Sequence, residues 1–492
     1  MNRIINEAQI TGHGDKVGRK LAARIIDAGL SAGDPYRNVK RLVGVRDGKL
    51  CFDDPQMVLK GDPKGSAAEY ELDGIDRIYI FAVGKGVQYP VKALEETLGG
   101  LITGGLVICK HGDRMLCERL PVVCGGHPIP DSNAIEGCAK ILEMAKAARF
   151  TERDLVISVM GSGIGSLCTL PDDGITLEDV KDYNYICQID KGMPTSDLSQ
   201  IRNQIDRIKG GRFTRAMQPA RMVNLISGGA NMGAKPYAEV VTGNTWIHSL
   251  PDRTTTTAAI DAAKRWDVWD LLPRSIVKKL ESNPPEGDTL SPAEFEKCDI
   301  RVFCIVPPEQ NALGAARKEA ESLGFSTVTM AEFTSCEASE VGTFMGQVAL
   351  NCLKNGEPFK APAAIFTTGE LITTVGKETG VGGTNQEYCL AAARVIDGSR
   401  GIVIAAVDTD GTDGPGGDFH PKAAAKGITV LAGGLVDGHT AQEARERGVD
   451  LFDALKRHDA SSALWELDSG VAAAQNISVG DLHCVLIMED GE

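Results

Sequence analysis

The chain has 492 residues, more than one compact core usually holds, so we expect two domains of unequal size. Its 52 basic and 67 acidic residues give a formal net charge of −15, which argues against nonspecific binding to nucleic acid or to anionic lipid. No apolar run reaches the length of a signal-peptide core or a membrane span, so we expect a soluble, cytoplasmic protein. The 13 cysteines include no Cys-x-x-Cys pair, so the sequence indicates reduced thiols rather than a zinc site.

The first buried strand is predicted over residues 78–83, and Gly84-Lys85-Gly86 follows it. A lysine between two glycines at the carboxyl end of a strand is placed to meet a phosphate, because glycines let the backbone approach and the ammonium is a compact charge. Lysines in solvated turns are more frequent, however. The tripeptide alone therefore leaves both interpretations of Lys85 open.

A rigid loop is predicted where the sequence reads Gly-Gly-His-Pro-Ile-Pro-Asp over residues 125–131. Its two prolines exclude regular structure, and its last residue is placed to cap a helix over residues 132–148. His127 is a candidate substrate contact. A lone loop histidine is more often a hydrogen-bonding strut, so that alternative stays open.

The strand predicted over residues 154–160 ends in a second glycine-rich loop, Gly-Ser-Gly-Ile-Gly-Ser. Backbone amides and two hydroxyls in such a loop can surround an oxyanion, which makes Ser162, Gly163 and Ser166 candidate phosphate ligands. Arg202 and Arg212 further along are candidate clamps for a carboxylate or phosphate, because a guanidinium offers bidentate donors. Lys209 and Arg212 also flank a glycine pair that ends a helix, where carbonyls favour cations, so a capping role is adequate for them.

A polar, proline-rich segment at residues 283–292 is the best candidate boundary between domains. We therefore expect an N-terminal α/β domain over residues 1–285 and a C-terminal α/β domain over 293–492. Packing of the last segment back on the first domain stays open. Strand-like and helix-like runs alternate after the boundary, from residue 300 onward. The predicted fold is α/β, with two largely parallel sheets flanked by helices and an active-site cleft between the domains.

A glycine-rich loop over residues 380–383 precedes Thr384-x-x-Glu387, the spacing of a capping box, so a helix is predicted to begin at Thr384. The amino end of such a helix suits an anion, although plain helix initiation explains the box as well. The apolar strand predicted over residues 402–407 then delivers three acids, Asp408, Asp410 and Asp413. Close acids without a balancing cation raise one another's pKa, so a metal or phosphate role and an ordinary turn both stay open.

These residues resemble the C-terminal MOFRL domain of type II glycerate 2-kinases, which has the same glycine-rich loop, Asn-Gln-Glu and Thr-Asp-Gly-x-Asp-Gly after a strand. Three earlier segments also match that family in the same order: the His-Pro loop, a Pro-x-x-Gly-Ile-Thr-Leu-Glu run at 171–178 and Lys-Gly-Gly-Arg at 209–212. Thr176 in the second segment is also a plain helix N-cap. The sequence is identified as a divergent member of the family.

The resemblance implies an ATP-dependent kinase that transfers the γ-phosphoryl group to a hydroxyl of glycerate or of a related hydroxy or sugar acid, with ATP and Mg²⁺. The resemblance also implies a small-molecule substrate as partner, with no nucleic acid and no membrane, and leaves a homo-oligomer open. The implied catalytic residues are Lys85, Asp408 and Asp410, and the implied metal ligands are Asp408, Asp410 and Asp413. The implied substrate and phosphate contacts are Ser162, Gly163, Ser166, His127, Arg202, Lys209, Arg212, Asn385 and Glu387.

Two departures from the family pattern concern charge. Val381 and Thr384 stand where the family has arginines, and residues 227–233 carry glycine and asparagine where the family has acids. A charged hydrogen bond contributes roughly 1.5–3 kcal/mol, so we expect weakened glycerate kinase activity and a natural ligand other than D-glycerate plus ATP. The alternatives are a non-kinase enzyme acting on a related small sugar acid, with an eroded ATP site, or a non-catalytic binding protein on the same scaffold.

Overall fold

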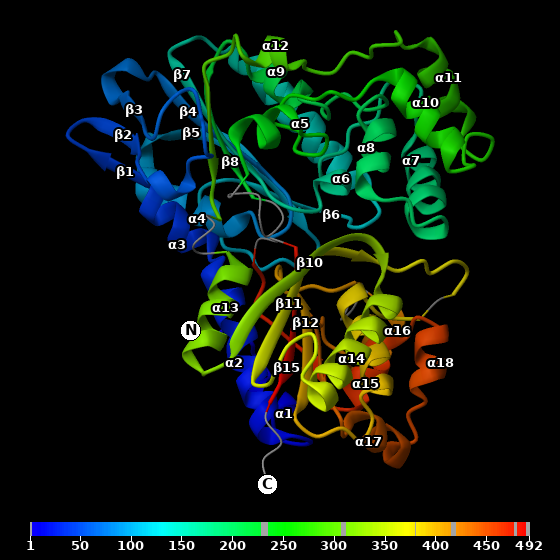
Figure 1. Cartoon of the computed structure of the whole chain (residues 1–492). Coiled ribbons are helices and arrows are strands. Elements are labelled where there is room, and N and C mark those ends of the chain that lie inside the picture. Colours follow the sequence, from blue (N-terminus) through cyan, green and yellow to red (C-terminus); the bar gives the residue numbers. More distant parts are fainter. Residues whose placement is uncertain are drawn as a thin grey trace. The chain divides into compact units, whose positions relative to one another are not determined.

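The computed structural model describes residues 2–227, 235–306, 311–378, 380–414, 420–476 and 480–488 (Figure 1). The chain forms two compact units. The central unit is Asp34–Pro308, and the terminal unit combines Met1–Gly33 with Glu309–Glu492. This division differs from the predicted domains 1–285 and 293–492, because the first 33 residues belong with the C-terminal part of the chain.

The central unit is built on a six-stranded sheet in which every pairing is parallel. The strands lie in the order β6-β5-β4-β7-β8-β9, so the chain starts in the middle, runs to one edge and then returns to fill the other half. This is the order of a doubly wound sheet, and its topological switch point lies between β4 and β7. The strands are β4 (Arg77–Val83), β5 (Ile102–Lys110), β6 (Val122–Gly125), β7 (Asp154–Met160), β8 (Arg221–Ile226) and β9 (Ile300–Cys304).

Strand β9 corrects the predicted boundary. It follows the proline-rich segment, yet it pairs with β8 from Met222 to Ile226 and completes the central sheet. All five of its residues are buried, because both of its faces are covered. The proline-rich segment is thus a connection within the central unit.

Helices and a small sheet complete the central unit. A second apolar cluster, apart from the core of the sheet, joins α7, α8, α10 and α11. Local signals place several helix starts: Asp131 caps α5, and Thr176 forms a capping box with Asp179 at α7, which confirms the N-cap predicted there. The helices are α3 (Pro35–Leu42), α4 (Gln88–Leu98), α5 (Ser132–Ala148), α6 (Ile164–Leu167), α7 (Leu177–Asn184), α8 (Thr195–Arg202), α9 (Arg212–Met217), α10 (Thr256–Arg265), α11 (Arg274–Ser282) and α12 (Pro292–Phe295). The small antiparallel sheet consists of β1 (Val43–Arg46), β2 (Lys49–Phe52) and β3 (Ala68–Glu71).

The terminal unit has a six-stranded mixed sheet, in the order β10-β11-β15-β12-β13-β14. Only β10 and β11 pair in parallel, so this sheet is less parallel than predicted. The last strand, β15, lies antiparallel between β11 and β12, which shows that the end of the chain completes the terminal sheet. The strands are β10 (Ser326–Glu337), β11 (Ala363–Ile372), β12 (Ile402–Asp408), β13 (Gly433–Asp437), β14 (Gly470–Val471) and β15 (Asp481–Ile487).

Helices cover both faces of the terminal sheet (Figure 1): α14 and α15 pack on one face, and α2 and α13 pack on the other. The N-terminal segment is fixed by Arg19 of α2, a fully buried residue whose Nε donates to Asp437 Oδ2 at 2.6 Å. The helices are α1 (Glu7–Ile10), α2 (Lys16–Ala32), α13 (Ala312–Ser322), α14 (Ala338–Asn355), α15 (Thr384–Val395), α16 (Pro421–Ala425), α17 (Thr440–Arg447), α18 (Leu451–Lys456) and α19 (Ala460–Glu466). None of the described helices combines the length and the apolar character needed to cross a bilayer.

Candidate functional site

The loops that follow β4 and β7 meet at the switch point of the central sheet. The Lys85 amide donates to the Ser162 carbonyl at 2.9 Å, and the Gly161 amide donates to the Val83 carbonyl at 3.0 Å. A Cβ on Gly84 would lie 2.8 Å from the Gly161 Cα, so this close approach requires glycine. The two predicted glycine-rich loops therefore form one surface at the carboxyl end of the sheet, where doubly wound folds bind ligands.

His127 joins this surface beside Gly163. A Cβ on Gly163 would lie 2.8 Å from the His127 ring and 3.1 Å from Lys85 Cγ, so the ring and the lysine flank the same glycine. Burial of the ring, and next the charge of Lys85, lower the pKa of His127 well below its usual range. The imidazole is therefore neutral near pH 7.

Ser166, in contrast, has a structural role at this surface. Its hydroxyl donates to the carbonyl of Pro128 and so holds the His-Pro loop against the start of α6. Ser166 is buried, with 3% of its surface exposed. Its predicted contact with phosphate has no basis in this arrangement, whereas Lys85, Ser162, Gly163 and His127 do lie together.

Arg202, at the end of α8, reaches the same region. A Cβ on Gly165 would lie 2.5 Å from Arg202 Nη1. Nη2 donates to Asn184 Oδ1 at 2.7 Å and to Gln188 Oε1 at 2.9 Å, while Nε has no hydrogen-bond partner in the described structure. Both acceptors are neutral amides, and only 8% of the arginine surface is exposed. A buried guanidinium without a counter-charge is costly, so this position is suited to an anionic ligand.

A group of buried polar atoms near Arg202 was missed by the sequence analysis. His248 has 3% of its surface exposed, and neither ring nitrogen has a partner among the described residues. Burial, followed by the charges of Lys209, Arg202 and Arg212, lowers its pKa well below the usual range. The loop that carries it lies against the end of α8, because Asn203 Nδ2 donates to the Thr245 carbonyl at 2.7 Å.

Other buried atoms around this loop also lack partners in the part of the chain that is described: Asn203 Oδ1, Ser227 Oγ, Ser249 Oγ and Asp252 Oδ1. Leaving such an atom unsatisfied costs about 1–3 kcal/mol. A polar ligand would restore these hydrogen bonds. No local pattern in the sequence marks His248.

Lys209 and Arg212 have mainly structural partners. Lys209 is 2% exposed, and its Nζ donates to three acceptors, the nearest being the Cys168 carbonyl at 2.6 Å. All three of its donors are thus used within the protein, which leaves none for the predicted phosphate contact. Arg212 Nη1 donates to the carbonyls of Asn203 at 2.7 Å and Lys209 at 3.2 Å, so this arginine binds main-chain carbonyls. The predicted helix stop at the glycine pair is wrong, however, because α8 already ends at Arg202 and Gly211 is the N-cap of α9.

In the terminal unit, α15 begins at Thr384 as predicted, but no capping box forms. The N-cap is Gly383, and the capping carboxylate comes from Asp413, whose Oδ1 accepts from Asn385 N at 3.2 Å and whose Oδ2 accepts from Gln386 N at 2.9 Å. The Thr384 hydroxyl donates to the same carboxylate. The predicted anion site at this helix end is therefore filled by the protein's own Asp413.

Asn385 and Glu387 are likewise engaged inside the unit. Asn385 Nδ2 donates to Asp481 Oδ1 at 2.7 Å, and Glu387 Oε1 lies 2.7 Å from His458 Nδ1. Burial raises the pKa of the Glu387 carboxyl above its usual value. Both residues support the acidic end of the sheet, and the structure does not favour direct substrate contacts for them.

An acidic pair lies where β12 ends and β15 begins. Asp408 and Asp481 are directly opposite each other in the strand register. Asp481 Oδ2 accepts from Leu371 N at 3.0 Å, and burial, followed by the charge of Asp408, raises the Asp481 pKa well above its usual range. Asp410 lies next in the turn, where its Oδ1 accepts from Thr412 N at 2.7 Å.

The predicted three-carboxylate metal centre is not assembled. Within the described residues no group of three His, Cys, Asp or Glu side chains is arranged to hold a metal ion. Asp413 caps α15 instead of joining Asp408 and Asp410, and the neighbour of Asp408 is Asp481. Asp481 lies 73 positions after Asp408 in the sequence, so residue spacing cannot predict that the two are neighbours.

The position of Val381 explains the absence of an arginine there. Its side chain is 1% exposed and packs with Ala423, Ile428 and Trp465. A charged side chain in this orientation would be buried among apolar groups. Of the second divergent stretch, only Ser227 is described, and residues 228–233 lie outside the described part of the chain.

The doubly wound central sheet, with cationic groups at its switch point, defines an α/β protein suited to an anionic ligand. Residues 21–281 match the family model described as "Domain of unknown function (DUF4147)", and residues 363–476 match the MOFRL family. The chain is 30% identical to a glycerate 2-kinase of Pyrococcus horikoshii over 448 residues, which cover 91% of this chain and 92% of that protein. It belongs to the glycerate 2-kinase family.

Two further comparisons are with Thermotoga maritima. The chain is 29% identical to a D-glycerate 2-kinase over 393 residues, which cover 79% of this chain and 85% of that enzyme. The crystal structure of a glycerate kinase superposes with a TM-score of 0.67 at 27% identity, covering 95% of this chain and 99% of that one. The two-sheet α/β architecture is thereby confirmed.

Proposed function

We propose that this protein is an ATP-dependent glycerate 2-kinase, which transfers the γ-phosphoryl group of ATP to the 2-hydroxyl of D-glycerate. The observation that carries the proposal is the buried Arg202 beside the switch point, because its charge has no carboxylate partner among the described residues and the substrate that accepts the phosphoryl group carries a carboxylate. The names of the relatives support the reaction class. They do not favour a non-kinase enzyme or a non-catalytic binding protein.

The central unit supplies the groups for anion recognition. Arg202 binds the glycerate carboxylate, and His248, kept neutral, adds a hydrogen bond to the same ligand. Lys85 lies at the glycine-rich loops, where it stabilises negative charge on the transferred phosphoryl group. Phosphoryl transfer depends mainly on positioning and charge neutralisation, so these three residues meet its main demands.

The residues of the terminal unit fit a magnesium ion. Carboxylate oxygens are the ligands that Mg²⁺ prefers, and it often uses only one or two of them besides water and phosphate. Asp408 and Asp481 would hold it, because their mutual repulsion, evident in the raised pKa of Asp481, calls for a cation or a proton. When bound, Mg²⁺ neutralises charge on the phosphates.

The test is steady-state kinetics with D-glycerate, ATP and Mg²⁺, with the product identified by ³¹P NMR. We expect kcat/KM above about 10⁴ M⁻¹s⁻¹ and phosphate on the 2-oxygen. Val381 and Thr384 led to the opposite expectation, a ligand other than D-glycerate plus ATP, so the same measurement decides between the two. Turnover far below this range, or phosphate on the 3-oxygen, would rule the proposal out.

A further inference from the structure

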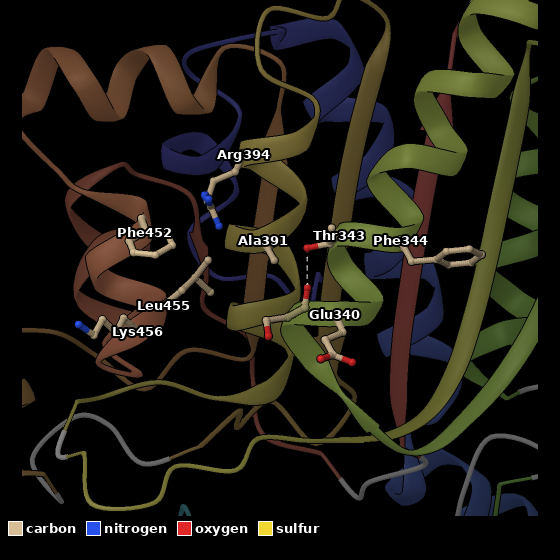
Figure 2. A pocket seen from close by; sticks show the side chains of 9 residues that line it. Glu340, Thr343, Phe344, Ala391, Arg394, Phe452, Leu455 and Lys456 are labelled. Atoms are coloured by element: carbon tan, nitrogen blue, oxygen red, sulfur yellow. Dashed lines mark hydrogen bonds between the residues drawn. The ribbon is translucent and has the colours of Figure 1, made fainter.

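A groove on the surface of the terminal unit contains none of the residues discussed above. It has a volume of about 520 Å³ and lies between α14, α15 and α18 (Figure 2). Its lining residues are Ser339, Glu340, Thr343, Phe344, Ala391, Arg394, Phe452, Leu455 and Lys456. Helix α15 provides the floor with Ala391 and Arg394, and α14 and α18 form the two walls.

Two phenylalanines at this groove are largely exposed. Phe452, on α18, has 62% of its surface exposed, and Phe344, on α14, has 52%. Figure 2 shows Phe452 at the α18 wall and Phe344 projecting from the far side of α14. Burying a phenylalanine side chain contributes roughly 1.5–3 kcal/mol, so two exposed rings beside one recess favour an interaction surface.

The two walls carry opposite charge. Glu340 lies on the α14 wall, whereas Arg394 and Lys456 lie on the floor and the α18 wall. None of these three side chains forms an ion pair with another described residue. The Arg394 guanidinium lies 5.1 Å from the centre of the Phe452 ring, which leaves its charge available to a partner.

We propose that this groove is the interface of a symmetric homodimer, in which the α14 wall of each copy faces the α15 and α18 side of the other. A two-fold interface is self-complementary: one patch must present both members of each contact. This patch presents both, since it combines the protruding Phe452 ring with a recess and an acid with two bases. The symmetry sets Glu340 of each copy against Arg394 and Lys456 of the other.

The first test is the mass of the full chain in solution. Sedimentation over about 1–100 µM, which brackets micromolar dissociation constants, should give twice the 52.3 kDa mass of the chain. Phe452→Glu should weaken association by roughly thirtyfold or more, because aromatic residues at the centre of an interface carry most of its energy. Phe452 is exposed, so the variant should fold and keep its kinase activity.

The second test uses charge reversal and separates this pairing from any other dimer. Glu340→Lys alone, and the double variant Arg394→Glu with Lys456→Glu, should each be monomeric because like charges would meet. A mixture of the two variants should form a heterodimer, since every pair then has opposite signs. Glu446→Lys, at an exposed position on α17, is the matched control and should leave association unchanged.

Three results would overturn the proposal. The first is a wild-type chain that remains monomeric throughout this range, which would indicate a different occupant for the groove. The second is a dimer that Phe452→Glu does not weaken. The third is a mixture of the charge variants that fails to associate.

Discussion

The carboxyl end of the central sheet and the end of the terminal sheet where β12 stops differ in the sign of their charge and in how their charged groups are partnered. In the central unit, Lys85 and Arg202 are cationic, and His248, Ser227 and Arg202 Nε keep buried atoms without partners in the described structure. In the terminal unit, the acids around β12 accept hydrogen bonds from the unit itself, as Asp413 and Asp481 do. Buried atoms without partners among the described residues also occur near the terminal acids, for example Asn385 Oδ1 and His483 Nε2. The comparison therefore teaches that a buried cation without a carboxylate partner in the described structure, rather than unmet hydrogen bonds alone, identifies the end suited to an anion.

The same contrast explains two features with similar sequence signals. Both units have a glycine-rich loop that leads into a helix. In the central unit the loop at 161–165 approaches Lys85, His127 and Arg202, whereas in the terminal unit the amino end of α15 is closed by Asp413. One loop therefore lies beside cationic side chains, and the other beside an internal carboxylate.

The largest effect is expected for Arg202→Leu. Removing a buried charge that binds an oppositely charged group costs about 2–5 kcal/mol, so kcat/KM for D-glycerate should fall about a hundredfold or more. The loss should lie mainly in KM for glycerate and much less in KM for ATP. Arg207→Leu is the matched control, because Arg207 is half exposed and pairs only with the exposed Asp173. An unchanged KM for glycerate would show that the carboxylate binds elsewhere.

Lys85→Ala should have the next largest effect. It should lower kcat at least tenfold, equivalent to about 1.4 kcal/mol of barrier, with an unchanged melting temperature. Lys92→Ala on α4 serves as control, since Lys92 forms only surface ion pairs. If Lys85→Ala turned over D-glycerate like the wild type, this lysine would have no part in the reaction, and the central loops would be structural.

Sequence reasoning succeeded where the determinants are local. Continuous apolar runs predicted β7 over residues 154–160 and most of β4 and β12, and the glycines that follow β4 and β7 predicted the loops at the ends of these strands. The start of α15 was also correct. Each of these features depends on neighbouring residues, whose spacing and side-chain types are visible in the sequence.

Sequence reasoning failed where contacts between residues far apart in the chain determine the structure. Thr384-x-x-Glu387 has the spacing of a capping box, but the Asp413 carboxylate arrives from 29 positions away and takes the free amides of α15. Asp481 reaches Asp408 only because β15 inserts between β11 and β12. Spacing could not reveal either contact, nor the approach of the His248 loop to Arg202.

A stability measurement can test the capping of α15. Asp413→Ala should lower the free energy of unfolding by about 1–2 kcal/mol, because two helix amides lose their acceptor. Thr384→Ala should cost much less, as its hydroxyl only donates to that carboxylate. Differential scanning calorimetry of both variants checks this order. The reverse order would restore the capping box and leave the anion site at α15 open.

His248→Phe tests the unpartnered ring in the central unit. A neutral hydrogen bond contributes about 0.5–1.5 kcal/mol, so kcat/KM for D-glycerate should fall roughly three- to tenfold. The melting temperature should stay the same or rise, because the ring has no partner in the described protein to lose. A fall in stability with full activity would show instead that His248 is a structural residue.

The smallest effect is expected for Asp481→Asn in the terminal unit. This substitution should raise the stability of the protein, whereas the other substitutions lower activity or stability. Burial and the charge of Asp408 raise the pKa of Asp481 in the folded state. Below the unfolded pKa of about 4, both states are protonated and the substitution changes little. As the pH rises toward the folded pKa, the unfolded state loses its proton first, so the wild type loses stability.

The variant should therefore melt about 1–3 °C higher than the wild type at pH 7 and at nearly the same temperature at pH 4. The new amide also has an acceptor, since Asn385 Oδ1 has no partner among the described residues. Mg²⁺ should raise the melting temperature of the wild type and have less effect on the variant, because a ligand of the folded state stabilises it. A variant that melts lower at every pH would show that the Asp481 carboxylate stabilises the fold. The repulsion between Asp408 and Asp481 would then no longer distinguish this end of the terminal sheet from the central site.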